Sequence, residues 1–373
     1  MIYRRYMNKN LIILISIILS TGCSTFNRVI LPLKDIPKPN GPHRVGTIAF
    51  EWEDANRKEW FTREEDDYRR LIVQFWYPTN DKEIQGKNPY LDNPSQRTKP
   101  ISDQIDIPSF LMSHLDEVNK NSIDLASISS SEKDFPLIVF SHGLGGMRMQ
   151  NTIQCEELAS RGYVVVAMDH AFDAHATFFK NKPLANFRSG IEGQISEEEF
   201  WSIRTPQLNT RAADISFVID QISTLKESNS NSFFKAIKTN KVGIFGHSFG
   251  GATAIMASLL DTRIKACINL DGWIVPIPEK VIEKGIDKPF LYLGQEAWND
   301  TLNYIKLEKL IKNSNNTNRV LRLKGTKHYD FTDIPQIAPI ASKLGITGSM
   351  NTLKLKDLIN KEVVDFFDSF IYK

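Results

Sequence analysis

The chain has 373 residues, of which 41% are hydrophobic and 24% charged, and its formal net charge is +2. This near balance of charge excludes the strongly basic character of a nucleic-acid-binding protein. The hydrophobic share, with 22 phenylalanines, excludes a largely disordered chain and is enough for one large core.

The amino terminus predicts an export signal. Residues 1–10 carry three basic side chains, residues 11–19 are apolar apart from one serine, and small residues lead to Cys23. This order is typical of a secretory signal peptide, and the apolar run is shorter than the roughly 20 residues that span a membrane. The Gly-Cys pair resembles a bacterial lipobox, although Ser20 stands where leucine is most usual. We predict a signal peptide over 1–23 and export as a lipoprotein anchored to a bacterial membrane through Cys23. An ordinary cleaved signal peptide and an uncleaved anchor are the alternatives.

The next segments predict a tether followed by an opening pair of strands. Residues 24–42 are rich in Pro and Asn, which is typical of a linker, and we expect them to join the lipid to the fold. Residues 45–51 and 70–77 have the composition of strands. Residues 79–133 are polar, with one amphipathic patch at 110–118, and predict a long connection with short helices near a pocket mouth.

From residue 135 onward, strands and helices alternate. Continuous apolar runs predict buried strands, and longer amphipathic segments predict helices. The expected strands are 136–140, 163–167, 241–245, 264–270, 290–293 and 319–323, and the expected helices are 149–161, 206–226 and 353–370. Such alternation favours one α/β domain over 43–373, with a mostly parallel central sheet and helices on both faces, and the motif described next predicts that its fold is that of an α/β-hydrolase.

The segment Gly246-His247-Ser248-Phe249-Gly250 predicts a nucleophile elbow. It lies between an apolar strand and a helix-like run of small and apolar residues. In α/β-hydrolases this strand, sharp turn and helix expose a serine hydroxyl at the top of the sheet. The two glycines suit the turn because a Cβ at either position would crowd the backbone.

A serine nucleophile needs a base and an orienting acid, in the chain order serine, acid, histidine. His328 is the only histidine after His247, and it follows the predicted strand 319–323. Asp271 ends the strand 264–270 and is our predicted acid, because a carboxylate at a strand end is held rigidly. Glu296, after the next strand, is in the more usual place and remains the alternative.

Two backbone N–H groups are expected to form the oxyanion hole. One belongs to Phe249, the residue after the nucleophile. The other is predicted at Leu144, because residues 141–146 follow an early strand and read Ser-His-Gly-Leu-Gly-Gly. A phosphate-binding loop is the alternative, but no Gly-x-x-x-x-Gly-Lys is present.

The remaining histidines and aspartates are predicted to have structural roles rather than to bind a metal ion. Three histidines and two aspartates follow two of the predicted strands: His142, Asp169, His170, Asp173 and His175. They do not share a helical i, i+4 face, so structural or pocket-lining roles are expected, with metal ligation the alternative. Cys155 and Cys267 lie in core-like segments, and their pairing is left open. We predict no cofactor.

Four blocks of sequence, in order, resemble the plasma-type (group VII) platelet-activating factor acetylhydrolases. They are residues 136–145, 246–253, 270–273 and 325–331, and residues 158–163 are similar to the family's join between a helix and a strand. The likeness spans roughly residue 41 to the carboxyl terminus. Gly272 and Gly146 are mild departures, and the likeness is thin over 79–133 and 171–204, where acyl specificity would be decided.

The resemblance implies a calcium-independent serine esterase that cleaves short or oxidised sn-2 acyl chains of phospholipids. It places the nucleophile on Ser248, the acid on Asp271 and the base on His328, with Leu144 and Phe249 as oxyanion donors. The expected partners are an ester or phospholipid substrate and a membrane. A broad carboxylesterase or polyester hydrolase, and a surface lipoprotein that only binds, are the alternatives.

Overall fold

The computed structural model describes residues 24–82, 86–105, 107–130, 134–191, 193–228 and 231–372. The predicted signal peptide and Cys23 lie outside these residues. No helix among those described is long and apolar enough to cross a membrane.

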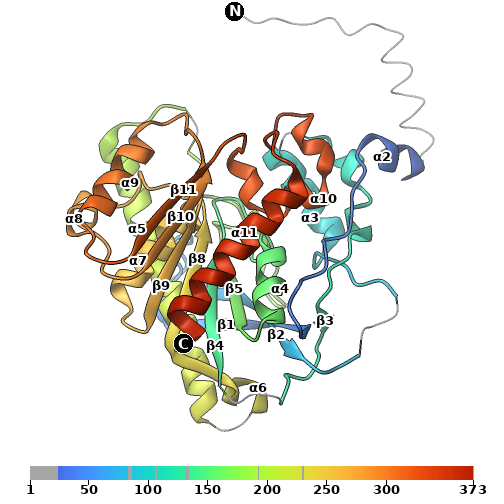
Figure 1. The fold of residues 1–373 in the computed structure, drawn as a ribbon, viewed down its shortest axis with the longest axis horizontal. Coiled ribbons are helices and arrows are strands. Elements are labelled where there is room, and N and C mark those ends of the chain that lie inside the picture. Colours follow the sequence, from blue (N-terminus) through green and yellow to red (C-terminus); the bar gives the residue numbers. More distant parts are fainter. Residues whose placement is uncertain are drawn as a thin grey trace, which may run out of the picture.

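One large sheet organises the described chain (Figure 1). Its nine strands have the order β11-β10-β9-β8-β4-β5-β2-β1-β3. Their bounds, from one edge to the other, are β11 (Asn318–Leu323), β10 (Phe290–Gln295), β9 (Ile264–Leu270), β8 (Ile237–His247), β4 (Phe135–Ser141), β5 (Val164–His170), β2 (Tyr68–Thr79), β1 (Arg44–Lys58) and β3 (Ile123–Asp124). The six strands from β11 to β5 are parallel, whereas β2 pairs antiparallel with β5, and β1 antiparallel with β2. The carboxyl ends of the parallel strands therefore meet at one edge of the sheet, where a site can form.

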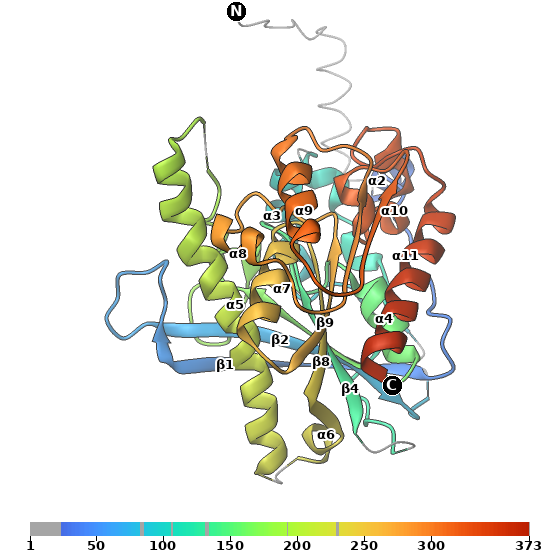
Figure 2. The same cartoon turned by 60° about the vertical axis from the view of Figure 1, so that its left-hand side comes forward.

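Helices cover both faces of the sheet, as Figure 2 shows. α5 (Glu197–Glu227), α7 (Phe249–Leu260), α8 (Glu279–Lys284) and α9 (Leu302–Lys312) contribute to one apolar cluster. α4 (Thr152–Ser160) and α11 (Thr352–Phe367) contribute to the other. Strands buried on both faces explain the continuous apolar runs, since all seven residues of β4 and of β5 are buried. The predicted α/β-hydrolase fold is confirmed.

Short elements complete the chain. They are α2 (Ser24–Ile30), α3 (Pro94–Ile105), η1 (Ser109–Met112), η2 (Leu115–Glu117), β6 (Ala176–Thr177), β7 (Ala185–Asn186), α6 (Ser232–Lys235), η3 (His328–Phe331), α10 (Ile334–Ile337), η4 (Pro339–Ser342) and η5 (Asp368–Tyr372). α3, η1 and η2 fall in the predicted long connection, so its expected short helices are present.

The long helix α5 begins at Glu197, nine residues before the start that we expected at Pro206. Its N-cap is Ser196, whose side chain accepts a hydrogen bond from the backbone N–H of Glu199. Three glutamates in the first turn add favourable charge at the positive end of the helix. These start signals prevail over the proline, which the helix contains in its interior.

The predicted tether does not behave as a free linker over its whole length. Leu31 and Ile36 are 4% and 3% exposed and belong to a core cluster. The backbone N–H of Lys34 donates to Ile337 O at 2.8 Å, and that of His43 donates to Ser160 O at 2.9 Å. This part of the chain lies against the domain because its apolar side chains find a partner surface that comes largely from later sequence.

Candidate active site

Ser248 lies in a backbone turn that few residues adopt. Its φ and ψ are 56° and −123°, between the last residue of β8 and the first of α7. A Cβ at Gly246 would lie 2.1 Å from Gly250 O, and one at Gly250 would lie 2.0 Å from Ser141 O. Both positions therefore require glycine, and the strained turn is the geometry of a nucleophile elbow.

His328 and Asp271 are joined by a hydrogen bond. The imidazole Nδ1 lies 2.7 Å from Asp271 Oδ2, although 57 residues separate the two in sequence. Asp271 follows β9 with a φ of 43° and is fully buried, while the His328 side chain is 30% exposed. Because an ionised carboxylate only accepts, Nδ1 carries a proton, and Nε2 is the nitrogen left to act as a base.

The last residue of β10 and the loop after it supply further donors to Asp271. Gln295 donates to Oδ1 through its backbone N–H and to Oδ2 through Nε2, both at 2.9 Å. The Trp298 indole N–H donates to Oδ1 at 3.0 Å, and its ring packs edge-on against His328 with centroids 5.0 Å apart. Glu296, the alternative acid, is exposed. The loop that we considered for an acid thus holds the carboxylate of Asp271, and no motif in the sequence marked Gln295 or Trp298.

His247 connects three parts of the site. Gly143 N–H donates to Gln150 Oε1 at 3.3 Å, so the same amide presents its Nε2 to His247 Nδ1 at 2.6 Å. The other ring nitrogen of His247 then donates to His328 O at 3.1 Å. Burial, with the nearby His328, holds the pKa of His247 well below its usual value, so this ring stays neutral.

The loop after β4 brings Leu144 to the same pocket as Ser248. The His170 backbone N–H donates to His142 Nε2 at 3.1 Å, so His142 Nδ1 carries the proton and donates to Gly143 O at 2.6 Å. That carbonyl belongs to the peptide whose N–H is that of Leu144. Phe249 opens α7, where N–H groups of the first turn lack intrahelical partners.

A buried polar network lies behind this loop, and sequence reasoning missed its connections. Ser141 Oγ lies 3.0 Å from His170 Nε2, and His170 Nδ1 lies 2.9 Å from Asp214 Oδ2. Arg69 forms an ion pair with Asp214 at 2.6 Å, and Arg211 Nη2 donates to Ser141 Oγ at 3.1 Å. Burial, followed by the charge of Arg211, lowers the pKa of His170 to about 3. All five side chains are at most 1% exposed, so the network supports the loop and has no access to substrate.

His175 lines the pocket while both of its ring nitrogens are used. Nδ1 donates to Gly146 O at 3.0 Å, and Nε2 accepts from Arg97 at 3.1 Å. Burial, then the charge of Arg97, lowers the pKa of His175 to about 4. Among the described residues, no group of three or more His, Cys, Asp or Glu side chains could hold a metal ion. Cys155 and Cys267 are buried and not bridged.

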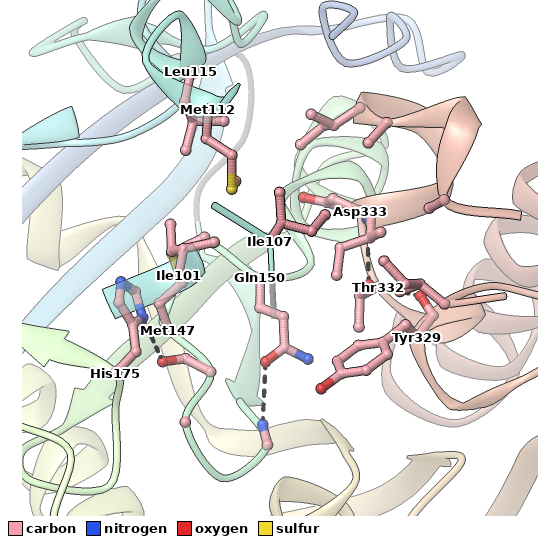
Figure 3. A pocket seen from close by; sticks show the side chains of 18 of the residues that line it. Ile101, Ile107, Met112, Leu115, Met147, Gln150, His175, Tyr329, Thr332 and Asp333 are labelled. Carbon is pink, nitrogen blue, oxygen red and sulfur yellow. Dashed lines mark hydrogen bonds between the residues drawn. The ribbon is translucent and has the colours of Figure 1, made fainter. Parts of the chain in front are cut away.

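The pocket beside Ser248 and His328 is mostly apolar (Figure 3). Its volume is about 1120 Å³, including space open to solvent. Its apolar side chains come from the segment before β1, from the connection before β4, from the loop after β4 and from the chain after His328. They include Leu31, Leu33, Leu91, Ile101, Ile107, Met112, Leu115, Leu144, Met147, Ile334, Ile337, Ile340, Leu344 and Ile346. A concave apolar pocket with a few polar groups at one place suits a small ligand with an apolar part.

Comparisons with known proteins agree with this picture. The model of the family "Platelet-activating factor acetylhydrolase, isoform II" matches residues 30–371. Platelet-activating factor acetylhydrolase of Gallus gallus is 26% identical, covering 90% of this chain and 83% of the relative. The platelet-activating factor acetylhydrolase of Cavia porcellus is 28% identical, covering 90% of this chain and 78% of the relative. A solved structure, the ferulic acid esterase of Streptomyces cinnamoneus, has a TM-score of 0.72 and 25% identity over 91% of this chain and 93% of that one.

The fold, with its serine elbow and apolar pocket, defines a carboxylic ester hydrolase of the α/β-hydrolase class. Within that class the chain belongs to the platelet-activating factor acetylhydrolase, isoform II family. The resemblance read from four sequence blocks is thereby confirmed.

Proposed function

We propose that the protein hydrolyses carboxylic esters through an acyl-enzyme on Ser248. The observation that carries the proposal is the 2.7 Å hydrogen bond between His328 and buried Asp271, beside a pocket that both His328 and Ser248 line. His328 Nε2 takes the hydroxyl proton as Oγ attacks the ester carbonyl, and it returns that proton to the departing alcohol. Asp271 orients the ring and stabilises the imidazolium.

The negative oxygen that forms during attack needs two donors, for which we propose the N–H groups of Leu144 and Phe249. The hydrogen bond from His142 Nδ1 to Gly143 O supports this role, because it fixes the peptide that ends in the Leu144 N–H. Water repeats the attack in the second half of the reaction, with His328 again as base, and frees the acid and Ser248.

We propose phospholipids with a short or oxidised sn-2 acyl chain as the substrate class. The family assignment supports this choice, and so does a relative from Arthroderma benhamiae described as a probable 1-alkyl-2-acetylglycerophosphocholine esterase, which is 26% identical over 64% of this chain. A broad carboxylesterase without phospholipid preference is the second candidate, favoured by the likeness to a ferulic acid esterase.

Two measurements test these proposals. Ser248→Ala should lower kcat on a short-chain aryl ester by about 10⁴-fold or more and abolish labelling by a fluorophosphonate probe. Substantial activity in that variant would refute the assignment of the nucleophile. Hydrolysis of a short-chain sn-2 phosphatidylcholine should then be compared with that of a simple aryl ester and a long-chain phospholipid. Activity on the aryl ester alone would favour the broad esterase.

The lipid anchor at Cys23 is a separate proposal. The basic, apolar and small segments of residues 1–23 support it. Cells given a labelled fatty acid should incorporate it into the protein, and Cys23→Ala should remove the label and release the protein from membranes. A labelled Cys23→Ala variant would contradict the attachment site.

A further inference from the structure

The segment between the predicted anchor and β1 contributes to the wall of the active-site pocket. We call residues 31–36 the N-terminal strap. Leu31 and Leu33 of this strap line the same pocket as Ser248 and His328. Leu31 is buried and Leu33 half-buried, so the strap presents apolar surface to the cavity.

Hydrogen bonds hold the strap to two other walls of the pocket. Lys34 N–H donates to Ile337 O at 2.8 Å, which joins the strap to the chain after His328. His114 Nε2 donates to Leu31 O at 2.9 Å, and Ile36 N–H donates to Asn119 O at 3.1 Å. The strap therefore bridges the C-terminal wall and the wall that comes from η1 and η2, and it cannot shift without breaking these bonds.

Most polar groups of the pocket are already satisfied by the protein. Gln150, His175 and His247 bind backbone or side-chain partners, as described above. The Asp333 carboxylate accepts from the N–H groups of Thr152 and Ile153 at 2.7 and 3.2 Å, which also caps α4. The Tyr90 hydroxyl lies 2.6 Å from Met149 O and 3.0 Å from Asp333 Oδ2, and Thr332 Oγ1 donates to Tyr329 O at 2.7 Å. A ligand beyond the reacting ester therefore meets mainly apolar surface.

Some of the apolar side chains lie away from Gln150 and Tyr329 (Figure 3). In Figure 3, Met112 and Leu115 project from one side, while Gln150 and Tyr329 lie toward the other. An unbranched hydrocarbon chain fits this arrangement, since it needs no hydrogen bonds and each methylene buried against apolar side chains favours binding.

We propose that the N-terminal strap forms part of the binding site for an apolar chain of the ester substrate. Leu31 and Leu33 then limit the length and width of the chain that the pocket accepts. The proposal rests on ester hydrolysis at Ser248 and adds a selectivity role for residues outside the catalytic groups. The chain can belong to the acyl group or to the alcohol, and the experiment separates the two sources.

The test measures kcat/KM for two ester series with purified full-length protein. Aryl esters with acyl chains of 2, 6 and 10 carbons vary the acid part of the ester. Acetates of 2-, 6- and 10-carbon alcohols vary the alcohol part. Leu33→Trp narrows the pocket and should lower the ratio of 10-carbon to 2-carbon kcat/KM by about tenfold or more in one series, in keeping with how pockets reject oversized groups. Leu33→Ala widens the pocket and should shift the same ratio upward.

Leu353→Trp is the matched control, because Leu353 is 58% exposed and does not line the pocket. It should leave both ratios unchanged. A shift in the acyl series assigns the chain to the acid, and a shift in the alcohol series assigns it to the leaving group. Unchanged ratios in both Leu33 variants, with normal hydrolysis of the 2-carbon esters, would overturn the role of the strap. Activity that survives Ser248→Ala would instead overturn the proposed function.

Discussion

Replacing Asp271 by asparagine tests the acid with almost no change in shape. Oδ1 accepts from Gln295 N and Trp298 Nε1 at 2.9 and 3.0 Å, and Oδ2 accepts from Gln295 Nε2 and His328 Nδ1 at 2.9 and 2.7 Å. An asparagine has one oxygen and one NH₂ group, so on either side the NH₂ meets two donors. If the NH₂ group faces His328, the ring must move its proton to Nε2, the nitrogen that has to accept the serine proton.

This loss of the correct tautomer should lower kcat by about 10⁴-fold, as it does in a serine protease triad. The corresponding rise in the activation free energy is about 5 kcal/mol. The unpaired donors should also destabilise the fold by about 1–3 kcal/mol, so the unfolding midpoint must be measured beside the rate.

The assay is steady-state hydrolysis of a short-chain aryl ester at the same mildly alkaline pH for every variant. Glu296→Gln is the matched control, because Glu296 is exposed and removal of its charge should leave kcat within about twofold. The reasoning is refuted if Asp271→Asn keeps most of its activity while folded, or if Glu296→Gln is the variant that loses it.

Three further predictions follow from contacts around the site. Trp298→Phe removes one donor to Asp271 but keeps the aromatic contact with His328, so kcat should fall about tenfold with little change in KM, and a KM effect alone would contradict a positioning role. Arg69→Met removes the guanidinium that pairs with the buried carboxylates of Glu59 and Asp214, and, among the described residues, only Asp214 keeps an ion pair, with Arg57. It should cost about 3–5 kcal/mol in urea unfolding, whereas Arg28→Gln, at the exposed pair with Glu117, should leave the midpoint unchanged. His175 is neutral in the fold because its pKa is lowered to about 4, so its contribution to stability is present above pH of about 6.5 and is lost as the pH falls toward 4. The difference in unfolding free energy between the protein and His175→Gln should therefore shrink between pH 7.5 and 5, and a constant difference would contradict the neutral, buried ring.

The sheet was predictable because its strands carry their own signal. β4 and β5 are buried throughout and contain continuous apolar runs. Such a run can be recognised from a few consecutive residues alone. The positions of Ser248 and His328 at the ends of strands followed from the same signal, since parallel strands bring their carboxyl ends to one edge. The start of α5 was harder to predict, because Pro206 favours a start at residue 206 whereas the capping residue Ser196 favours an earlier one.

Long-range contacts without a local pattern could not be predicted. The N-terminal strap looks like a linker in sequence, and one of its backbone hydrogen bonds is with Ile337, about 300 residues later. Gln295 and Trp298 carry no recognisable signal in the sequence, and their role depends on the fold, which brings the carboxylate of Asp271 to them. Ser141, His170 and Asp214 likewise meet only through the packing of α5 on the sheet.

With Asp271, which follows β9, as the proposed acid, the residues at the end of β10 are restricted. Gln295 Nε2 lies 2.9 Å from Asp271 Oδ2, and the backbone N–H of the same residue donates to Oδ1. A glutamate at position 295 would bring a second negative charge against the first, and the two carboxylates would have to share a proton. Such sharing would raise the pKa of the pair and weaken the attraction that keeps the imidazolium of His328 in place. In this fold, a catalytic acid can therefore follow β10 instead of β9 only if the residue at position 295 and its neighbours change at the same time.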